Sequence, residues 1–307
     1  MTTSPRIVSL IPSATEIVDY LGLADALVGR SHECDSPISV QALPVCTEPK
    51  FDPVGSSRDI HDRVTMLLQS ALSVYRVKTE VLEALSPTHI LTQAQCEVCA
   101  VNLADVEVAI ATLTTMQPRV ISLQPLTLRD VWEDVERVAA ALGVTADLAP
   151  LQQRVNDCAT ETQVIPTGDR PTVVCIEWAE PLMAAGNWVP ELVELAGGRS
   201  RLAQVGKHSP WLTWEALLDA DPDILVIMPC GFDLARTRQD AEALSQHPQW
   251  RTLTAVKTGR VYLTDGNQYF NRPGPRLVDS LEMLAEIIHP AQFQFDYEGK
   301  GWCRFSG

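Results

Sequence analysis

Short apolar runs alternate along this chain with amphipathic stretches of helical periodicity. In the first part the pattern predicts strands at 6–10, 27–30, 89–92 and 119–123, and helices at 12–21, 80–85 and 101–115. In the last part it predicts strands at 173–176, 224–227 and 260–263, and helices at 190–195 and 277–288. Because strands that alternate with helices form βαβ units, the pattern predicts an α/β fold with mainly parallel sheets.

The middle of the chain follows another pattern. Residues 127–163 are nearly continuous in helical periodicity, and Gly143 and Pro150 are expected to divide them into two segments. A turn-rich segment at 165–171 comes next, after which strands and helices alternate again. We therefore predict an N-terminal α/β lobe at 1–126, a helical connector at 127–168 and a C-terminal α/β lobe at 169–307.

A weak internal similarity supports two lobes of related design. Glu80 lies seven positions before Pro87, and Glu215 lies seven positions before Pro222. Each proline precedes a predicted strand, so both segments are expected to form helix, turn and strand. Any two units of that kind share this pattern, which leaves a chance similarity as the alternative.

The balance of charge limits the classes of partner. The chain has 24 Lys and Arg residues against 39 Asp and Glu residues, a formal net charge of 24 − 39 = −15. So acidic a surface repels phosphate backbones and anionic lipids, which argues against nucleic-acid binding. No apolar run approaches the length of about 20 residues that a membrane helix needs, which argues against membrane insertion. The expected partner is a small-molecule ligand or another protein.

The start of the sequence and its cysteines bear on location. After Met1 the chain enters the first predicted strand without the apolar segment and cleavage site of a secretory signal. The sequence as written predicts a cytoplasmic protein, or a periplasmic one if the native N-terminus was trimmed. The eight cysteines are accordingly expected to be reduced thiols.

Three loops that follow predicted strands carry unusual residues: 31–35 (SHECD), 93–99 (QAQCEVC) and 229–232 (PCGF). In an open parallel sheet the ligand binds outside the carboxyl ends of the strands, so these loops are candidate binding loops. Their thiols suit soft metals such as zinc or iron, and the candidate metal ligands are Cys34, Cys96, Cys99 and Cys230. Cys96 and Cys99 form a C-x-x-C pair without a second pair, so a redox pair and buried small side chains stay open as alternatives.

Aromatic residues concentrate in the second half of the chain, several of them in loops beside Gly or Pro. Such side chains suit a flat apolar ligand, because they supply contact area at little cost in entropy. Packing inside the lobe is the alternative interpretation. The candidate ligand-binding residues are His32, Glu33, Tyr75, Gln95, Trp178, Trp188, Trp211, Phe232, Tyr269, Phe270 and Arg272.

Motifs of common enzyme classes are missing from the sequence. It contains no G-x-S-x-G, no phosphate-binding G-x-x-x-x-G-K-[ST] and no H-E-x-x-H. We therefore predict a binding protein rather than an enzyme. The alternative is a cytosolic metal-binding protein or metalloenzyme that uses the candidate cysteines together with His32.

Four segments carry a resemblance to a known family: 6–16 (RIVSLIPSATE), 29–35 (GRSHECD), 229–232 (PCGF) and 271–276 (NRPGPR). They resemble the cobalamin/iron-siderophore class of ABC-importer substrate-binding proteins, and more narrowly the branch called cobalamin-binding proteins. The resemblance covers roughly residues 6–290. It implies two Rossmann-like lobes joined by a long backbone helix, the class III architecture, with one ligand held between the lobes. That ligand would be a cobalamin-like corrinoid or another metal chelate.

The resemblance also implies a partner. Members of this class present one glutamate per lobe to arginines of the ABC transporter permease, and by position these are Glu80 and Glu215. Both glutamates also fall in the first turn of a predicted helix, where a carboxylate is favourable without any partner.

Overall fold

The computed structural model describes residues 4–69, 74–94, 103–111, 113 and 117–306, and the chain divides into two compact units. Unit 1 comprises Met1–Gly55, Asp59–Pro125 and Arg129–Asp147. Unit 2 comprises Ser56–Arg58, Leu126–Leu128 and Leu148–Gly307. Each unit contains a sheet of its own, and the two are described separately below.

The sheet of unit 1 is parallel, in the order β2-β1-β5-β6. Its strands are β1 (Ile7–Ser9), β2 (Leu27–Arg30), β5 (His89–Gln93) and β6 (Arg119–Leu123). Val8, Ile90 and Leu91 are fully buried. The central strands β1 and β5 are buried along nearly their whole length, as expected of strands that are covered on both faces, whereas burial alternates along the edge strands β2 and β6.

Helices and a small ribbon complete unit 1. The helices are α1 (Pro12–Tyr20), α2 (Ser57–Gln69), α3 (Thr79–Leu85), α4 (Leu103–Ala111) and α5 (Leu128–Leu142), with 3-10 turns η1 (Ala24–Ala26) and η2 (Ile38–Ala42). An antiparallel ribbon pairs β3 (Thr47–Pro49) with β4 (Tyr75–Val77). α1 begins after extended Ile11 with Pro12 in its first turn, and Gly22 at φ +72° follows its end, in agreement with the predicted helix.

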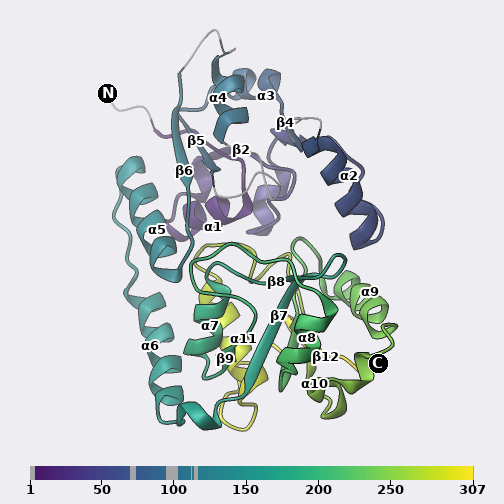
Figure 1. Ribbon diagram of the computed structural model, residues 1–307. Coiled ribbons are helices and arrows are strands. Elements are labelled where there is room, and N and C mark those ends of the chain that lie inside the picture. Colours follow the sequence, from purple (N-terminus) through teal and green to yellow (C-terminus); the bar gives the residue numbers. More distant parts are fainter. Residues whose placement is uncertain (1–3, 70–73, 95–102, 112, 114–116, 307) are drawn as a thin grey trace. The chain divides into compact units, whose positions relative to one another are not determined.

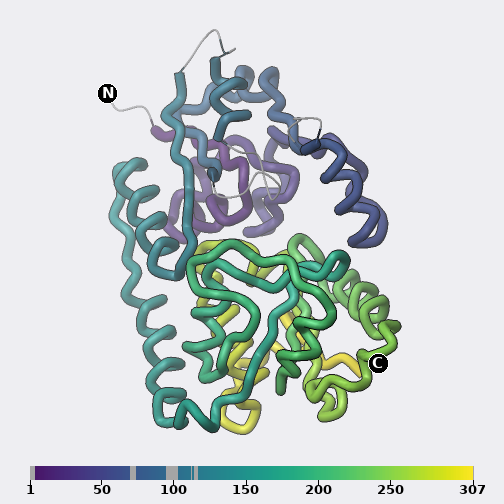
Figure 2. The backbone as a smooth tube through the Cα atoms, in the orientation of Figure 1, coloured from purple at the N-terminus to yellow at the C-terminus, as the bar shows by residue number. Residues whose placement is uncertain are grey.

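The sheet of unit 2 runs β12-β11-β10-β7-β8, and β9 also pairs with β7. Its strands are β7 (Thr172–Trp178), β8 (Met183–Ala184), β9 (Arg199–Ser200), β10 (Ile224–Ile227), β11 (Val261–Thr264) and β12 (Trp302–Arg304). The central strands β7, β10 and β11 are parallel, whereas β8 and β12 are antiparallel to their neighbours. In Figure 2 the yellow C-terminal segment returns to this sheet, where β12 pairs with β11.

Helices cover both faces of this second sheet. They are α6 (Ala149–Gln163), α7 (Val189–Leu195), α8 (Trp214–Ala220), α9 (Leu234–Ser245), α10 (Thr254–Lys257) and α11 (Leu277–Ile288), with 3-10 turns η3 (Thr167–Asp169) and η4 (Trp250–Thr252). Figure 1 shows α7 and α11 on one side of β7, and α8 and α10 on the other. The parallel α/β fold predicted from the alternation of strands and helices is confirmed.

The helical stretch in the middle of the chain consists of two helices, α5 and α6, as predicted. Gly143 follows α5 with φ +76°, a conformation that glycine adopts without steric cost. Pro150 lies in the first turn of α6 and so does not break a helix, because the backbone N–H that it lacks has no partner there. From Arg129 onward α5 belongs to unit 1, and α6 belongs to unit 2. The division at 126 and 168 stays a prediction.

The predicted repeat has a structural counterpart. α3 leads to β5 and α8 leads to β10, and each helix ends at a residue in the left-handed conformation, Ser86 at φ +47° and Asp221 at φ +33°. The backbone N–H of Ser86 bonds Leu82 O, and that of Asp221 bonds Leu217 O. Both segments are therefore helix, left-handed turn and strand.

Within the residues that the structure describes, no helix is both long enough and apolar enough to cross a membrane.

Candidate functional site

In unit 1 the loop after β2 is anchored by the ribbon β3–β4. The backbone N–H of His32 donates to Thr47 Oγ1 over 3.0 Å, and His32 Nδ1 lies 2.7 Å from the same oxygen. Thr47 is fully buried. The imidazole is thus fixed both through its backbone and through its ring.

Aromatic rings flank this histidine. The ring centroid of Tyr75, on β4, lies 5.5 Å from that of His32, and the ring of Phe51 lies 6.3 Å from that of Tyr75. Glu33 Oε1 lies 4.0 Å from His32 Nε2. The structure therefore brings together three of the residues predicted to bind ligand: His32, Glu33 and Tyr75.

The electrostatic surroundings keep His32 neutral. Burial, and then the positive charges of Lys78 and Arg30, lower the pKa of His32 to about 4. Neutral imidazole is the form in which histidine binds a metal.

Cys34, a predicted metal ligand, belongs to this loop and is 1% exposed. The buried Thr15 hydroxyl, on α1, lies 3.0 Å from its sulfur. Gln95, Cys96 and Cys99 lie outside the described residues.

In unit 2 a row of side chains crosses the edge of the sheet. Trp178 at the end of β7 pairs with Met183 of β8, and Met183 forms a bridge with Trp211. Directly paired residues place their side chains on the same face of a sheet. The Phe232 ring lies 5.3 Å from that of Trp178, and the Arg236 guanidinium lies 4.4 Å from the centre of the Phe232 ring. We call Trp178, Met183, Trp211, Phe232 and Arg236 the aromatic strip.

The strip has a rigid base and an exposed end. Trp211 is 58% exposed, whereas Trp178 Nε1 donates to Glu180 O over 3.1 Å. The segment before Trp211 packs closely on Gly186, where a β-carbon would lie 2.5 Å from Lys207 O. Rigid aromatic surface of this kind binds a flat molecule at a low entropic cost.

Other aromatic residues predicted to bind ligand lie inside unit 2. Trp188 and Phe270 are buried, and Trp188 Nε1 donates to Phe270 O over 2.7 Å. Arg272 is also buried and donates to Asn267 Oδ1 over 3.0 Å. These contacts match the alternative of packing inside the lobe. Tyr269 is half-buried, with the Arg276 guanidinium 5.3 Å from its ring centre.

The structure provides little for a metal site made by protein side chains alone. Cys230 is half-buried, and its backbone N–H donates to Glu177 O over 3.2 Å. Within the described part of the chain, no three His, Cys, Asp or Glu side chains form a group that could hold a metal ion. The cysteine site therefore stays a prediction.

Four contact residues of these two surfaces were not predicted from the sequence: Phe51, Thr47, Met183 and Arg236. Thr47 and Met183 belong to strands of three and two residues, too short to give a periodic pattern. Arg236 and Phe232 are four positions apart at the start of α9. This spacing brings side chains together, so the sequence could have indicated their contact.

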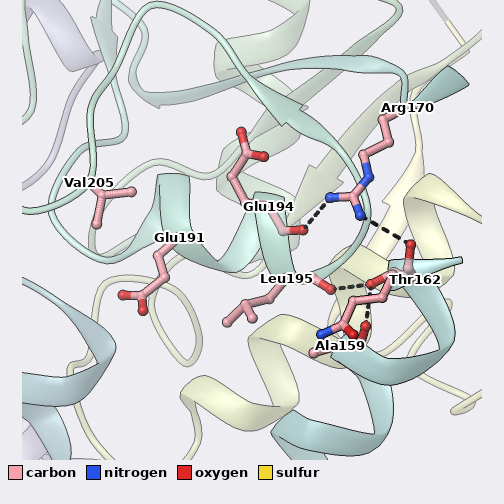
Figure 3. Close-up of a pocket in the computed structure, with 8 residues that line it drawn as sticks. Ala159, Thr162, Arg170, Glu191, Glu194, Leu195 and Val205 are labelled. Atoms are coloured by element: carbon pink, nitrogen blue, oxygen red, sulfur yellow. Dashed lines mark hydrogen bonds between the residues drawn. The ribbon is translucent and has the colours of Figure 1, made fainter. Parts of the chain in front are cut away.

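A cavity of about 300 Å³ lies elsewhere in unit 2, between α6 and α7 (Figure 3). Arg170 crosses it and donates to the carbonyls of Thr162 and Glu194, while the Thr162 hydroxyl donates to Leu195 O over 2.8 Å. No predicted site residue lines this cavity. Its polar groups hold the two helices together, so we assign no ligand to it.

Comparison with known proteins identifies the family. A family model described as "Periplasmic binding protein" matches residues 7–268. The chain belongs to the periplasmic binding protein family. The resemblance inferred from the sequence is thereby confirmed. Because this is a family of binding proteins, the prediction that the chain is not an enzyme is confirmed as well.

Relatives of this chain cover nearly all of it. The uncharacterized ABC transporter substrate-binding lipoprotein YvrC of Bacillus subtilis is 24% identical over 302 residues, which are 94% of this chain and 81% of that protein. The vitamin B12-binding protein of Vibrio cholerae is 23% identical over 301 residues, 94% of this chain and 91% of that protein. The crystal structure of a periplasmic heme binding protein from Pseudomonas aeruginosa superimposes with a TM-score of 0.70 at 21% identity, over 99% and 98% of the two chains. This last similarity shows a shared fold.

Proposed function

We propose that this member of the periplasmic binding protein family is the substrate-binding protein of an ABC importer, and that its ligand is a metal chelate, in particular a cobalamin-like corrinoid. The aromatic strip of unit 2 carries the proposal, because it offers flat, preorganised apolar surface at the edge of a sheet. The names of two relatives support it, since one is a vitamin B12-binding protein and another an ABC transporter substrate-binding lipoprotein.

The strip suits a macrocycle with a polar rim. The rings of Trp178, Trp211 and Phe232 provide the apolar face. Arg236 lies over Phe232 at one end of the strip and is held by Asp240 at 2.9 Å, so a cation stands beside the rings. The amide or carboxylate substituents of a corrinoid would accept hydrogen bonds from the Arg236 guanidinium.

Cobalamin binding is tested by titration. Cobalamin should quench the tryptophan fluorescence of the wild-type protein, and Trp211→Ala should weaken cobalamin binding about tenfold or more, as expected for an aromatic anchor. Trp214→Ala is the matched control, since Trp214 stacks on His247 at 3.8 Å outside the strip. Unchanged affinity in both Trp211→Ala and Trp178→Ala would refute the role of the strip.

Haem is the second candidate ligand, because a structural neighbour is a periplasmic heme binding protein. Parallel titrations with hemin and with cobalamin, followed by absorption, distinguish the two. Tighter binding of hemin would reassign the ligand within the same class of chelates.

We also propose that Glu80 and Glu215 dock on the importer. Glu80 lies in the first turn of α3 with its side chain 63% exposed, and Arg76 is 3.8 Å away. Glu215 lies in the first turn of α8 and is fully exposed, and a hydrogen bond from its own backbone N–H, followed by one from the Thr213 hydroxyl, lowers its pKa. Both positions thus present an exposed carboxylate, a group that pairs well with arginine.

Docking and ligand binding are separable by experiment. The variant Glu80→Ala/Glu215→Ala should bind cobalamin like the wild type but abolish uptake of labelled cobalamin by cells that carry it as their only copy. Asp219→Ala, an exposed change on the same helix α8, is the control. Loss of ligand affinity in the double variant would show that these glutamates belong to the binding surface.

Three expectations stay predictions. A site made of Cys34, Cys96, Cys99 and Cys230 predicts stoichiometric zinc or iron in elemental analysis of the purified protein. The location of the ligand between the lobes and the cytoplasmic location of the protein also await a test, for the latter by cell fractionation.

A further inference from the structure

Trp214 and His247 form a flat aromatic stack in unit 2. Their ring centroids lie 3.8 Å apart, and the two ring planes differ by only 5°. Trp214 is the first residue of α8, and His247 follows α9, so the two rings come from separate segments of the chain. Both residues are half-buried, and neither belongs to the aromatic strip. The proposed ligand surface therefore does not account for this stack.

Both rings of the stack are fixed by their surroundings. The backbone N–H of His247 donates to Leu244 O over 3.1 Å, and His247 O accepts the N–H of Trp250 over 2.9 Å. The ring nitrogen Nδ1 of His247 accepts the backbone N–H of Gln249 over 3.3 Å. Trp214 packs against the hydrophobic core of the unit. Because neither ring has to be ordered first, a partner that contacts the stack loses little side-chain entropy.

Glu215 places a carboxylate beside the stack. It follows Trp214 directly in the sequence and is fully exposed. A hydrogen bond from its own backbone N–H is the largest of the effects that lower its pKa, and the positive charge of His247 is another, so the carboxylate lies near the imidazole. Within the described part of the chain, Glu215 forms no ion pair with lysine or arginine. Its charge can therefore pair with a cation of a partner.

Glu80, the proposed docking glutamate of unit 1, has a cation of its own chain nearby. Arg76 Nη2 lies 3.8 Å from Glu80 Oε1, and Arg76 Nη1 lies 3.2 Å from Glu48 Oε1. A cation that approached Glu80 would also meet the charge of Arg76. Charge complementarity to a cationic partner is therefore stronger at Glu215.

A carboxylate beside stacked aromatic rings suits arginine in particular. The guanidinium group is planar, forms two parallel hydrogen bonds with a carboxylate and stacks on aromatic rings. The ammonium group of lysine is a compact, strongly hydrated charge without this geometry. A preference for guanidinium over ammonium therefore distinguishes such a surface from a general attraction between opposite charges.

We propose that Trp214 and His247, together with Glu215, form the surface of unit 2 that receives an arginine side chain of the importer. This inference rests on the proposed docking of Glu215. The carboxylate accepts the paired hydrogen bonds of the guanidinium, and the aromatic stack supports its plane. An exposed contact between a cation and an aromatic ring strengthens binding about two- to fivefold.

Binding to membrane vesicles tests this surface without any ligand. Fluorescently labelled protein is titrated with right-side-out membrane vesicles from the cells in which it occurs, and liposomes of the same lipids give the background. His247→Ala should weaken vesicle binding about two- to fivefold. His247→Phe, which keeps an aromatic ring against Trp214, should bind like the wild type. N-acetyl-arginine amide should compete with the vesicles more strongly than N-acetyl-lysine amide does.

A double-variant cycle shows whether the stack and the carboxylate hold the same group. Glu215→Ala should by itself weaken vesicle binding about tenfold or more, as expected for a charged hydrogen bond. In that background His247→Ala should have little further effect, because the guanidinium is no longer held over the ring. Full additivity of the two changes would contradict a shared arginine.

Phe295→Ala is the matched control for His247→Ala. Phe295 is also an exposed aromatic residue of unit 2, and its ring centroid lies 5.8 Å from that of Phe293. Phe295→Ala should bind the vesicles like the wild type. The far-ultraviolet circular dichroism of His247→Ala should match that of the wild type, so that weaker vesicle binding does not reflect unfolding.

The possible results separate this inference from the proposed docking. If His247→Ala binds the vesicles like the wild type while Glu215→Ala binds weakly, the aromatic surface is overturned and docking by the glutamate stands. An equal loss in Phe295→Ala would also overturn the aromatic surface. If the wild type binds vesicles no better than liposomes, or if Glu80→Ala/Glu215→Ala binds them like the wild type, both proposals are overturned.

Discussion

Gly266, in the loop after β11, occupies a position where a side chain does not fit. A β-carbon there would lie 2.1 Å from Pro229 O and 2.9 Å from Met228 O, both backbone atoms. Asn271 Nδ2 holds these two backbone segments together, because it donates to Met228 O and to Gly266 O. We expect Gly266→Ala to lower the free energy of unfolding by about 1–3 kcal/mol, because the two backbone segments must move apart.

Gly168→Ala is the matched control for this substitution, since a β-carbon at Gly168 meets nothing within 4 Å. Urea unfolding of both variants measures the difference. Equal stability of the two would contradict the expected clash.

Asp134 on α5 makes stability depend on pH. Burial raises its pKa to about 6 from an ordinary value of 3.8, although Arg137 and the backbone N–H of Gln124 favour the charged form. Between these two values the folded state binds more protons than the unfolded state. The contribution of Asp134 to stability therefore falls as pH rises through this window, and stays low above pH 6.

Asp134→Asn should remove this dependence. We expect the variant to gain thermal stability relative to the wild type between pH 4.5 and pH 7.5, as followed by differential scanning fluorimetry. Glu136→Gln, an exposed change on the same helix, should show no such trend. If the difference in thermal stability between Asp134→Asn and the wild type does not change with pH, the raised pKa of Asp134 is contradicted.

The candidate site could be predicted from the sequence only in part. His32 and Trp178 follow predicted strands, so the rule that ligands bind at the carboxyl ends of parallel strands selects them. Thr47, which fixes His32, is fifteen positions away in the sequence and has no motif around it. Trp188 is buried, and the sequence could not indicate this, because an aromatic residue beside glycine can belong to a loop surface or to the core.

At the scale of elements, α6 and α11 are joined by a half-buried ionic cluster. Arg154 donates to Glu282 Oε1 over 2.8 Å and to Asp279 Oδ1 over 2.7 Å, and the Tyr297 hydroxyl bonds both carboxylates. Glu282 is 6% exposed. Arg154→Leu would leave that carboxylate buried beside another without their cation. Because the Arg154 side chain is 38% exposed and solvent screens the cluster, we expect a loss of about 1–3 kcal/mol in the free energy of unfolding.

The exposed pair Arg129–Glu133 on α5 provides the control for Arg154→Leu. Its side chains are 84% and 57% exposed, and Arg129→Leu should cost at most about 0.5 kcal/mol. Adding Glu282→Gln to Arg154→Leu should recover part of the loss, because it removes one unpaired charge. Chemical denaturation measures this recovery. If the double variant is no more stable than Arg154→Leu, the loss comes from the packing of the arginine rather than from its charge.

Elements with a clear hydrophobic period could be predicted from the sequence, whereas the shortest strands and the polar helices α2 and α9 could not. The predicted helix at 277–288 coincides with α11, and the predicted strand at 119–123 coincides with β6. β8 and β9 have two residues each, too few for a hydrophobic period, and β12 pairs with a strand far away in the sequence. The polar helix α9 was missed because its buried face is narrow and includes Thr237 and Asp240.

At the scale of the whole molecule, two units with separate sheets should not unfold as one. Six of the seven tryptophans lie in unit 2, and Trp132 on α5 is the exception. In a Trp132→Phe background, tryptophan fluorescence therefore reports on unit 2, whereas far-ultraviolet circular dichroism reports on both units. We expect Arg154→Leu and Gly266→Ala to lower the fluorescence midpoint in urea, and Asp134→Asn to change only the circular dichroism transition. Coincident transitions that move together in all three variants would mean that the chain unfolds as a single cooperative unit.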